Sequence, residues 1–341
     1  MLADRLGLHV STVSRALHAP PEQGRRAASS ATVARIRELA DELGYRPNPH
    51  ATSLRTQRSN LVGVLVPRLS DLVLATVYEG IEEAASEHGL HAFVANTRDR
   101  ADAQRAQTEM MLARRVDGLI FGDARSDDGF LDEVAARDVP FVLVSRHAGG
   151  HTSVTCDDPL GGRLAADHLL GLGHRDLAVI AGEPYASTGL DRTRGFLERC
   201  AEVGVSVPAD RVVRSAFDAR GGRDAVDRIL AAPGPPPTAV FAVNDFAAIG
   251  AMGALRDRGL HPGRDVAVVG FNDTPLAQEL PVPLTSVHSP MHEMGRRGLD
   301  LLTRLMGGRP APSERLAPTL EVRASSERPV GDMRDGDRTA T

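Results

Sequence analysis

Residues 2–17 constrain the fold of this chain more than any other stretch. Their sequence, LADRLGLHVSTVSRAL, places apolar residues at helical spacing on both sides of Gly7: Leu2, Ala3 and Leu6, then Val13, Ala16 and Leu17. A glycine supplies the positive φ that a tight turn between helices requires. Two short helices joined in this way predict a helix-turn-helix, whose second helix enters the DNA major groove. The alternative is an ordinary helical hairpin with a solvated polar face.

The outer face of the second helix is rich in hydrogen-bond donors. Such side chains reach phosphates and base edges. We therefore predict that this helix contacts DNA through Val10, Ser11, Thr12, Ser14 and Arg15.

A third helix is predicted over residues 29–43. Apolar residues recur at helical spacing, Ser29 or Ser30 is placed to cap the helix, and Gly44 is placed to end it. Two helices alone bury too little surface, so a third helix completes the small core that a DNA-binding head requires.

Charge is distributed unevenly along the chain. Residues 1–60 hold nine arginines and five carboxylates, a net charge of +4, so residues 61–341 carry −9 of the total of −5. A basic head on an acidic body fits a nucleic-acid reader joined to a separate globular part. With 341 residues, two or three domains are expected.

Composition excludes several other classes of protein. No apolar run approaches the roughly 18 residues of a membrane span, and nothing at the N-terminus resembles a secretion signal. Cys156 and Cys200 are the only cysteines, which excludes a disulfide framework and favours a cytoplasmic protein with inert thiols. We find no phosphate-binding loop, no supported catalytic triad and no metal-ligand spacing, so we expect neither an enzyme nor a cofactor.

From residue 61 the pattern changes to apolar strands that alternate with amphipathic helices. The first series runs from LVGVLVP (61–67) to VPFVLVS (139–145), and the second begins near Pro159 and ends with DVAVVGF (265–271). Continuous apolar strands between helices indicate βαβ units and parallel sheets covered on both faces. Two doubly wound halves in series leave a cleft at the carboxyl ends of their strands, where small ligands bind.

Two segments carry a resemblance to a known family. STVSRAL (11–17) and the later LGYRPNPHATSLRTQRSNLVGVLVP (43–67) resemble the LacI/GalR, or lactose-repressor-type, family of bacterial transcription regulators. The resemblance implies an N-terminal all-α helix-turn-helix head and an α/β periplasmic-binding-protein-like body of two doubly wound parallel-sheet subdomains. It also implies that a helix over 291–306 returns to the first half and that a last strand near 319–323 joins the second.

The resemblance further implies a hinge after the head. There Leu54 is a wedge in the minor groove, an apolar role that such side chains play in bent DNA, and Arg55 and Asn48 contact DNA beside it. The alternative is a flexible proline-rich linker. Pro49 and Thr52 depart from the family's usual hinge residues, and His9 replaces its usual serine before the recognition helix, so we expect a poorer helix cap there.

These observations give a set of expected domain boundaries. The head covers 1–47, the hinge 48–60, the effector and dimerisation domain 61–330, and a disordered polar tail 331–341. Within the body, the first subdomain is expected at 61–158 and 288–318 and the second at 159–287 and 319–330.

Polar residues at the ends of strands indicate the ligand pocket. By resemblance, Arg192, Asn244 and Asn272 contact the effector and Phe217 stacks on it. Asp71 and Val73 stand where the family commonly has Asn-Pro-Phe, and Asn272 stands where it usually has Asp. Asp157, Asp245 and Asp273 serve equally well as caps of helices or turns. The predicted effector contacts are Asp71, Val73, Arg100, Ser145, Arg192, Phe217, Asn244 and Asn272.

The most consistent interpretation is a homodimeric DNA-binding transcription regulator, most simply a repressor. Its partners would be double-stranded operator DNA and a small polar effector, most simply a carbohydrate, with no membrane. On this interpretation Arg192→Ala abolishes the response to the effector without unfolding the protein. The alternative is a solute-binding protein of the same two-lobed fold, which would use the body without the basic head.

Overall fold

The computed structural model describes residues 2–18, 28–44 and 58–327 of the chain. It divides into two compact units, residues 1–60 and 61–341, which we call the head and the body and describe separately. The predicted DNA contacts Asn48, Leu54 and Arg55 lie outside the described residues, as does the predicted tail 331–341.

The head is the predicted helix-turn-helix with a third helix. α1 (Leu2–Leu6) and α2 (Val10–His18) flank Gly7, whose φ is +63°, and α4 spans Ser30–Glu42. Ser29 caps α4 by accepting the Thr32 N–H at 3.2 Å, as predicted. Apolar side chains from all three helices form one small core: Leu2, Ala3, Val13, Ala16, Ile36 and Ala40.

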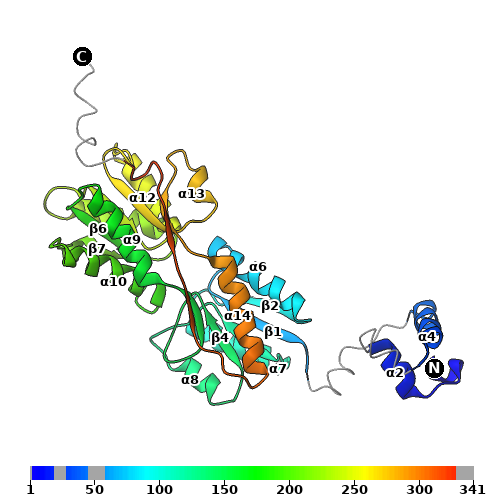
Figure 1. The fold of residues 1–341 in the computed structure, drawn as a ribbon. Coiled ribbons are helices and arrows are strands. Elements are labelled where there is room, and N and C mark those ends of the chain that lie inside the picture. The colour runs from blue at the N-terminus through cyan, green and yellow to red at the C-terminus, as the bar shows by residue number, and fades with distance from the viewer. Residues whose placement is uncertain (1, 19–27, 45–57, 328–341) are drawn as a thin grey trace. The chain divides into compact units, whose positions relative to one another are not determined.

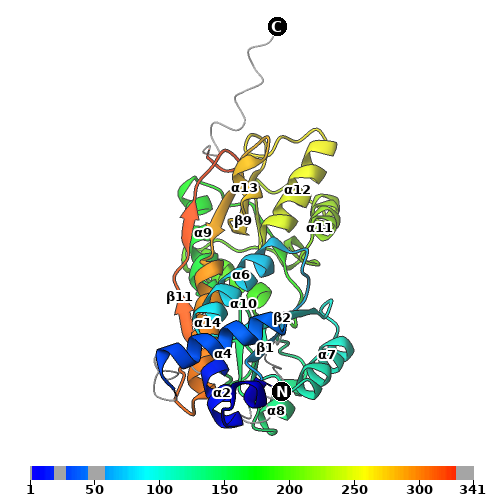
Figure 2. The same cartoon turned by 90° about the vertical axis from the view of Figure 1, so that its right-hand side faces the viewer.

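The body consists of two lobes, each built on a six-stranded sheet flanked by helices (Figures 1 and 2). The sheet of the first lobe has the order β11-β5-β4-β3-β1-β2, and all its pairs are parallel. Its strands are β1 (Leu61–Val66), β2 (His91–Asn96), β3 (Gly118–Phe121), β4 (Phe141–Val144), β5 (Ser153–Cys156) and β11 (Glu314–Leu316). Its helices are α6 (Leu72–Glu87), α7 (Ala101–Ala113), α8 (Phe130–Ala135) and α14 (Met291–Met306).

The sheet of the second lobe has the order β12-β10-β9-β8-β6-β7 and is parallel except for β12. Its strands are β6 (Leu177–Ala181), β7 (Val212–Arg214), β8 (Ala239–Ala242), β9 (Ala267–Asn272), β10 (Thr285–His288) and β12 (Thr319–Glu321). Its helices are α9 (Asp158–Gly171), α10 (Ser187–Glu202), the 3-10 turn Ala209–Arg211, α11 (Ala219–Ala231), α12 (Asp245–Asp257) and α13 (Leu276–Glu279).

The last part of the chain crosses between the lobes, as the resemblance implies. α14 packs beside α6 and against β4 of the first lobe, and β11 pairs with β5 in the same lobe (Figure 1). The following strand, β12, pairs antiparallel with β10 in the second lobe. Figure 2 shows this segment running along one side of the body from one lobe to the other.

The sequence prediction missed three strands, β5, β10 and β11. The residues of β5 are all buried, yet Ser153 and Thr155 interrupt the apolar run that marks the predicted strands, and Thr285 and Ser286 do the same in β10. β11 has only three residues, two of them charged.

Three pairs of helices pack through reciprocal glycine contacts. Across α9 and α10, a Cβ on Gly162 would lie 2.2 Å from the Arg192 carbonyl oxygen, and one on Gly195 would lie 2.1 Å from that of Pro159. The same reciprocal relation joins α6 to α14 and α11 to α12. Because a side chain larger than hydrogen would collide with backbone, these glycines let the paired helices touch directly. The other two pairs are Gly80 with Gly295 and Gly222 with Gly250.

Candidate functional site

The head presents α2 as a candidate recognition helix. Val10 at its start is 68% exposed, and Ser11 and Arg15 are exposed as well. Arg15 Nε donates to the Ser11 carbonyl oxygen at 3.1 Å, so its guanidinium lies along the first turn. Thr12 is half-buried, and the side chain of Ser14 lies outside what the structure describes.

His9 occupies the N-cap position of α2, where the sequence analysis expected a poorer cap than the family's usual serine. The Ser11 N–H donates to His9 Nδ1 at 3.3 Å, and Nδ1 also lies 2.8 Å from Ser11 Oγ. The imidazole therefore satisfies one of the free N–H groups of the first turn, as a serine or aspartate cap does.

The body holds a cavity of about 230 Å³ between its lobes, at the carboxyl ends of the strands. Seven of the eight predicted effector contacts line it. Asp71 caps α6, Ser145 follows β4, and Asn272 ends β9. The lining members of the predicted set are Asp71, Val73, Ser145, Arg192, Phe217, Asn244 and Asn272.

Arg100, the eighth residue, does not line the cavity. Its side chain is 65% exposed and pairs with Asp102 at 2.5 Å, in the first turn of α7. The preceding residues Arg98 and Asp99, both with positive φ, line the cavity instead. Two successive left-handed residues turn the chain so that Asp99, and not Arg100, faces the ligand space. Such backbone strain is concentrated at functional sites.

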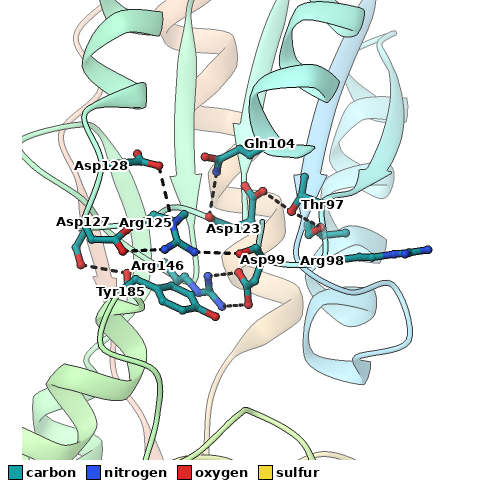
Figure 3. A network of polar contacts seen from close by, with 12 residues as sticks. Thr97, Arg98, Asp99, Gln104, Asp123, Arg125, Asp127, Asp128, Arg146 and Tyr185 are labelled. Carbon is teal, nitrogen blue, oxygen red and sulfur yellow. Dashed lines mark hydrogen bonds and ion pairs between the residues drawn. The ribbon is translucent and has the colours of Figure 1, made fainter. Parts of the chain in front are cut away.

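Asp99 holds a buried arginine in the cavity wall. Arg146 Nη1 and Nη2 donate to the two carboxylate oxygens of Asp99 at 2.6 and 3.0 Å, and the Arg146 side chain is 7% exposed. Figure 3 shows this pair within a wider network at the ends of β2, β3 and β4. Thr97 Oγ1 donates to Asp123 Oδ2 at 2.6 Å, and burial raises the pKa of Asp123. The sequence analysis did not include Arg146 among the predicted contacts.

Arg192 is part of a second buried ion pair. Its Nε donates to Asp158 Oδ1 at 2.7 Å and its Nη1 to the Val243 carbonyl oxygen at 2.8 Å, while its guanidinium lies 3.7 Å from the centre of the Phe271 ring. Burial raises the pKa of Asp158 to about 6, although the adjacent Arg192 acts in the opposite direction. Most of this guanidinium is thus engaged by the protein, and Nη2 remains for a ligand.

Two further polar residues line the cavity, Asp71 and Asn272. Asn272 is 3% exposed, has a φ of +105°, and its Oδ1 has no hydrogen-bond partner among the described residues. Asp71 accepts the Val73 N–H through Oδ1 at 3.0 Å, and burial raises the pKa of its carboxyl group. The raised pKa of Asp71 reflects the desolvation of a carboxyl group in the cavity wall.

Asn244, which the sequence analysis assigned as an effector contact, also makes structural hydrogen bonds. Its Oδ1 accepts the Ala247 N–H at 2.8 Å and caps α12, and its Nδ2 donates to the Phe217 carbonyl oxygen at 3.1 Å. Asn244 thus fixes Phe217, whose ring lies 5.7 Å from the Arg146 guanidinium.

Asp157, Asp245 and Asp273, which the sequence analysis described as equally suited to capping helices or turns, make structural contacts. Asp157 caps α9 through the Leu160 N–H. Asp245 is buried and accepts from Thr274 N–H at 2.6 Å and Ser286 Oγ at 2.5 Å. Asp273 pairs with Arg323 at 2.7 Å. None of the three lines the cavity.

Several contacts join the lobes around the cavity. The His147 N–H donates to Ser187 Oγ at 2.9 Å, and His147 Nε2 lies 2.7 Å from Asp191 Oδ2. Arg68 pairs with Asp218 at 3.3 Å, and both side chains are exposed. The lobes are therefore in contact around a preformed ligand space.

Other chemistry is not supported by the part of the chain that the structure describes. No group of three metal-ligating side chains comes together there. Burial raises the pKa of Cys156 to about 12 and that of Cys200 to about 11, so both thiols stay protonated. Among the described helices, none is long and apolar enough to cross a membrane.

Comparison with known proteins agrees with this geometry. Residues 166–326 match the model of the periplasmic binding protein-like domain. The HTH-type transcriptional regulator DegA of Bacillus subtilis (strain 168) is 30% identical to this chain over 95% of this chain and 96% of its own length. The chain belongs to the LacI/GalR family of bacterial transcription regulators.

Solved structures of LacI/GalR regulators match both the head and the body. The Lac repressor dimer bound to operator and the anti-inducer ONPF is 27% identical, with a TM-score of 0.84 over 95% of this chain and 97% of that one. The complex of the regulator CelR with cellobiose is 29% identical, with a TM-score of 0.74 over 96% and 98%. This LacI/GalR protein is thus a DNA-binding transcription regulator with a two-lobed body, which favours that prediction over a solute-binding protein. DegA, the Lac repressor and CelR are regulators rather than enzymes.

Proposed function

We propose that this chain is a repressor whose affinity for its operator is switched by a small polyol, most simply a sugar, bound between the lobes. The observation that supports the effector is the cavity itself, where Asp71, Asn272 and Arg192 offer hydrogen-bonding groups beside the ring of Phe217. Hydroxyl groups of a sugar both donate and accept, and its ring carbons stack on an aromatic face. The protein would act in the cytoplasm, without catalytic activity of its own.

The DNA contacts are proposed from the head. Val10, Ser11, Thr12, Ser14 and Arg15 would read the major groove. A homodimer would place two such heads on a pseudo-palindromic operator, with half-sites separated by about one helical turn or a multiple of it.

The switch would act through the hinge, for which we keep the boundaries 48–60. Asn48, Leu54 and Arg55 would contact the centre of the operator, with Leu54 inserted in the minor groove. An effector that binds one arrangement of the lobes more tightly than the other shifts the population between the two, and with it the geometry of the hinges. The body boundaries given above, with exchanges near 158, 287 and 318, are part of this proposal.

One experiment tests the effector and the switch together. A duplex selected from random DNA by the wild-type protein is labelled, and its binding is followed by fluorescence anisotropy while sugars, polyols and nucleosides are added. We expect one compound class to change the operator Kd. In Asp71→Asn, where Oδ1 still caps α6, we expect the effector Kd to rise about 5- to 150-fold, which corresponds to a lost contact of about 1–3 kcal/mol.

The matched control is Asp102→Asn, the same change on an exposed carboxylate outside the cavity. It should leave the effector Kd unchanged. If Asp71→Asn and Asp102→Asn respond alike, Asp71 does not contact the effector. If no compound changes the operator Kd, the proposal of a polyol effector is wrong.

A further inference from the structure

Tyr185 joins the two lobes at the wall of the effector cavity. It lies in the loop between β6 and α10 of the second lobe, and its carbonyl oxygen accepts hydrogen bonds from Ser126 N–H at 3.0 Å and Ser126 Oγ at 3.1 Å. Ser126 belongs to the first lobe, in the loop that follows β3. The half-buried Tyr185 also lines the cavity. One residue therefore takes part in both the lobe boundary and the ligand space.

The Tyr185 ring makes a second contact with the first lobe, through Arg125. The central carbon of the Arg125 guanidinium lies 3.9 Å from the ring centre (Figure 3), which is the geometry of a cation–π interaction. Burial raises the pKa of Tyr185 to about 12, so the side chain stays a neutral phenol. The Arg125 side chain is only 15% exposed, and a cation–π interaction strengthens as the cation loses its water.

Arg125 is held in place by its own lobe. Its Nε and Nη2 donate to the two carboxylate oxygens of Asp127 at 3.0 and 2.7 Å, and its Nη1 donates to the Asp99 carbonyl oxygen at 3.0 Å. Because three nitrogens of this planar group are engaged, its face is presented to the ring in one orientation. The place of the Tyr185 ring is therefore set by the first lobe, although Tyr185 belongs to the second.

Two other contacts between the lobes differ from this one. Arg68 lines the cavity and pairs with Asp218, but their side chains are 56% and 37% exposed, and exposed ion pairs contribute little. His147 lies 2.7 Å from Asp191, but neither residue lines the cavity. Of these three contacts, that of Tyr185 with the first lobe is the one that both reaches the cavity wall and is largely shielded from water.

We propose that Arg125 is a positioning residue for the effector, because it holds Tyr185, and with it the second lobe, in the arrangement that encloses the cavity. Separation of the lobes would break the ring contact and both hydrogen bonds from Ser126. An effector that contacts both lobes binds the closed arrangement more tightly, so these contacts increase the fraction of the protein that is competent to bind. The inference rests on the proposed function of the cavity as an effector site.

The separation of the lobes in the full-length protein tests this contact without any ligand. Nitroxide labels on Ala113→Cys and Asp224→Cys, at exposed positions of α7 and α11, report the distance between the lobes by double electron–electron resonance. The native cysteines are buried, and dilution with unlabelled protein removes signals between protomers. We expect a single population of distances for the wild-type protein and for Tyr185→Phe, which keeps the ring. Arg125→Met and Tyr185→Leu should each add a population at longer distance.

Two comparisons show whether Arg125 acts through Tyr185. In the double variant Arg125→Met with Tyr185→Leu, the longer population should be no larger than in the more open of the single variants. The matched control is Arg105→Met, which should leave the distances unchanged. Arg105 also binds a carboxylate, that of Glu133, and its guanidinium lies 4.6 Å from the centre of the Phe130 ring. These contacts lie within the first lobe and outside the cavity.

Effector binding is then measured in the same variants. The compound used is a sugar, polyol or nucleoside that raises the melting temperature of the wild-type protein. Calorimetry should give a Kd about 5-fold higher or more for Arg125→Met, and within about 2-fold of the wild-type value for Tyr185→Phe and Arg105→Met.

Each other result has a defined meaning. Unchanged distances in Arg125→Met and Tyr185→Leu, or effects that add in the double variant, overturn the assigned part of Arg125. An effector Kd in Arg125→Met that equals the wild-type value does the same. Longer distances in these variants, with no binding of any compound to any variant, refute the proposed polyol effector but support the part of Arg125 in lobe closure. If Arg125→Met does not fold, Tyr185→Leu must itself give both the longer distances and the weaker binding.

Discussion

Substitution of Arg192 by Met should destabilise the body strongly, and more so at neutral than at acidic pH. The two side chains of the Arg192–Asp158 pair are 5% and 2% exposed. Removing the cation leaves a buried carboxylate without its partner, which typically costs about 3–5 kcal/mol. The sequence analysis expected Arg192→Ala to spare the fold, and the buried pair now predicts the opposite.

The pH dependence follows from the pKa of Asp158, which burial already raises to about 6 beside Arg192. Without the guanidinium it rises further, so the folded variant takes up a proton that the unfolded chain does not. The destabilisation is therefore greatest above the pKa that Asp158 has in the folded variant, and it decreases as the pH falls below that pKa. Lowering the pH from 7.5 to 5.5 therefore restores more free energy of unfolding in the variant than the less than about 1 kcal/mol that Asp158, with a pKa of about 6, contributes in the wild-type protein.

Urea unfolding followed by circular dichroism measures both effects, which suits a chain without tryptophan. The matched variant Arg192→Met with Asp158→Asn removes the charge together with its partner, and it should recover stability at pH 7.5 and lose the added pH dependence. A single variant that is as stable as the wild-type protein, or that loses the same free energy at both pH values, would refute a buried charged pair.

Three further outcomes are expected. Arg15→Ala should weaken binding to a selected duplex by about 1–3 kcal/mol without changing the melting of the body, and an unchanged operator Kd in anisotropy would remove Arg15 from the interface. Ser29→Ala should cost about 1 kcal/mol of helix stability by removing the cap of α4, seen as faster amide hydrogen exchange there; unchanged exchange would contradict the capping contact. Gly195→Ala should destabilise the body by about 1–3 kcal/mol because its Cβ meets the Pro159 carbonyl oxygen. Gly171→Ala, where nothing lies within 4 Å of the added Cβ, should be neutral or slightly stabilising in the same urea titration.

Most of the fold could be predicted because local pattern and packing agree in this chain. Gly7 lies between the first two helices of the head and Ser29 caps the third, as expected. The predicted strands are the continuous apolar runs that are typical of a buried parallel sheet. β5 and β10 were missed because their polar residues, such as Ser153 and Thr285, are buried through tertiary pairing, to which no local signal points. β11 was missed because it has only three residues, two of them charged.

The candidate site was predictable where a residue directly follows a strand and less so in turns. Ser145 and Asn272 sit where their strands end, but Arg100 was chosen over Asp99 because spacing does not reveal two successive left-handed residues. Tyr185 was missed because its place depends on Arg125 of the other lobe. An aromatic residue in a loop acquires such a part only when the lobes meet.

The reciprocal glycine contacts affect how ligand binding in the cavity can change the affinity for DNA. In each of the three helix pairs, a backbone oxygen of one helix occupies the place that a side chain of the other would need, so neither helix can shift along its partner without collision. Each lobe is therefore stiff, because its paired helices cannot slide past one another. A ligand in the cleft would therefore move the lobes as stiff bodies relative to one another, and contacts at their boundary, such as His147 with Ser187 and Ser126 with Tyr185, would have to change.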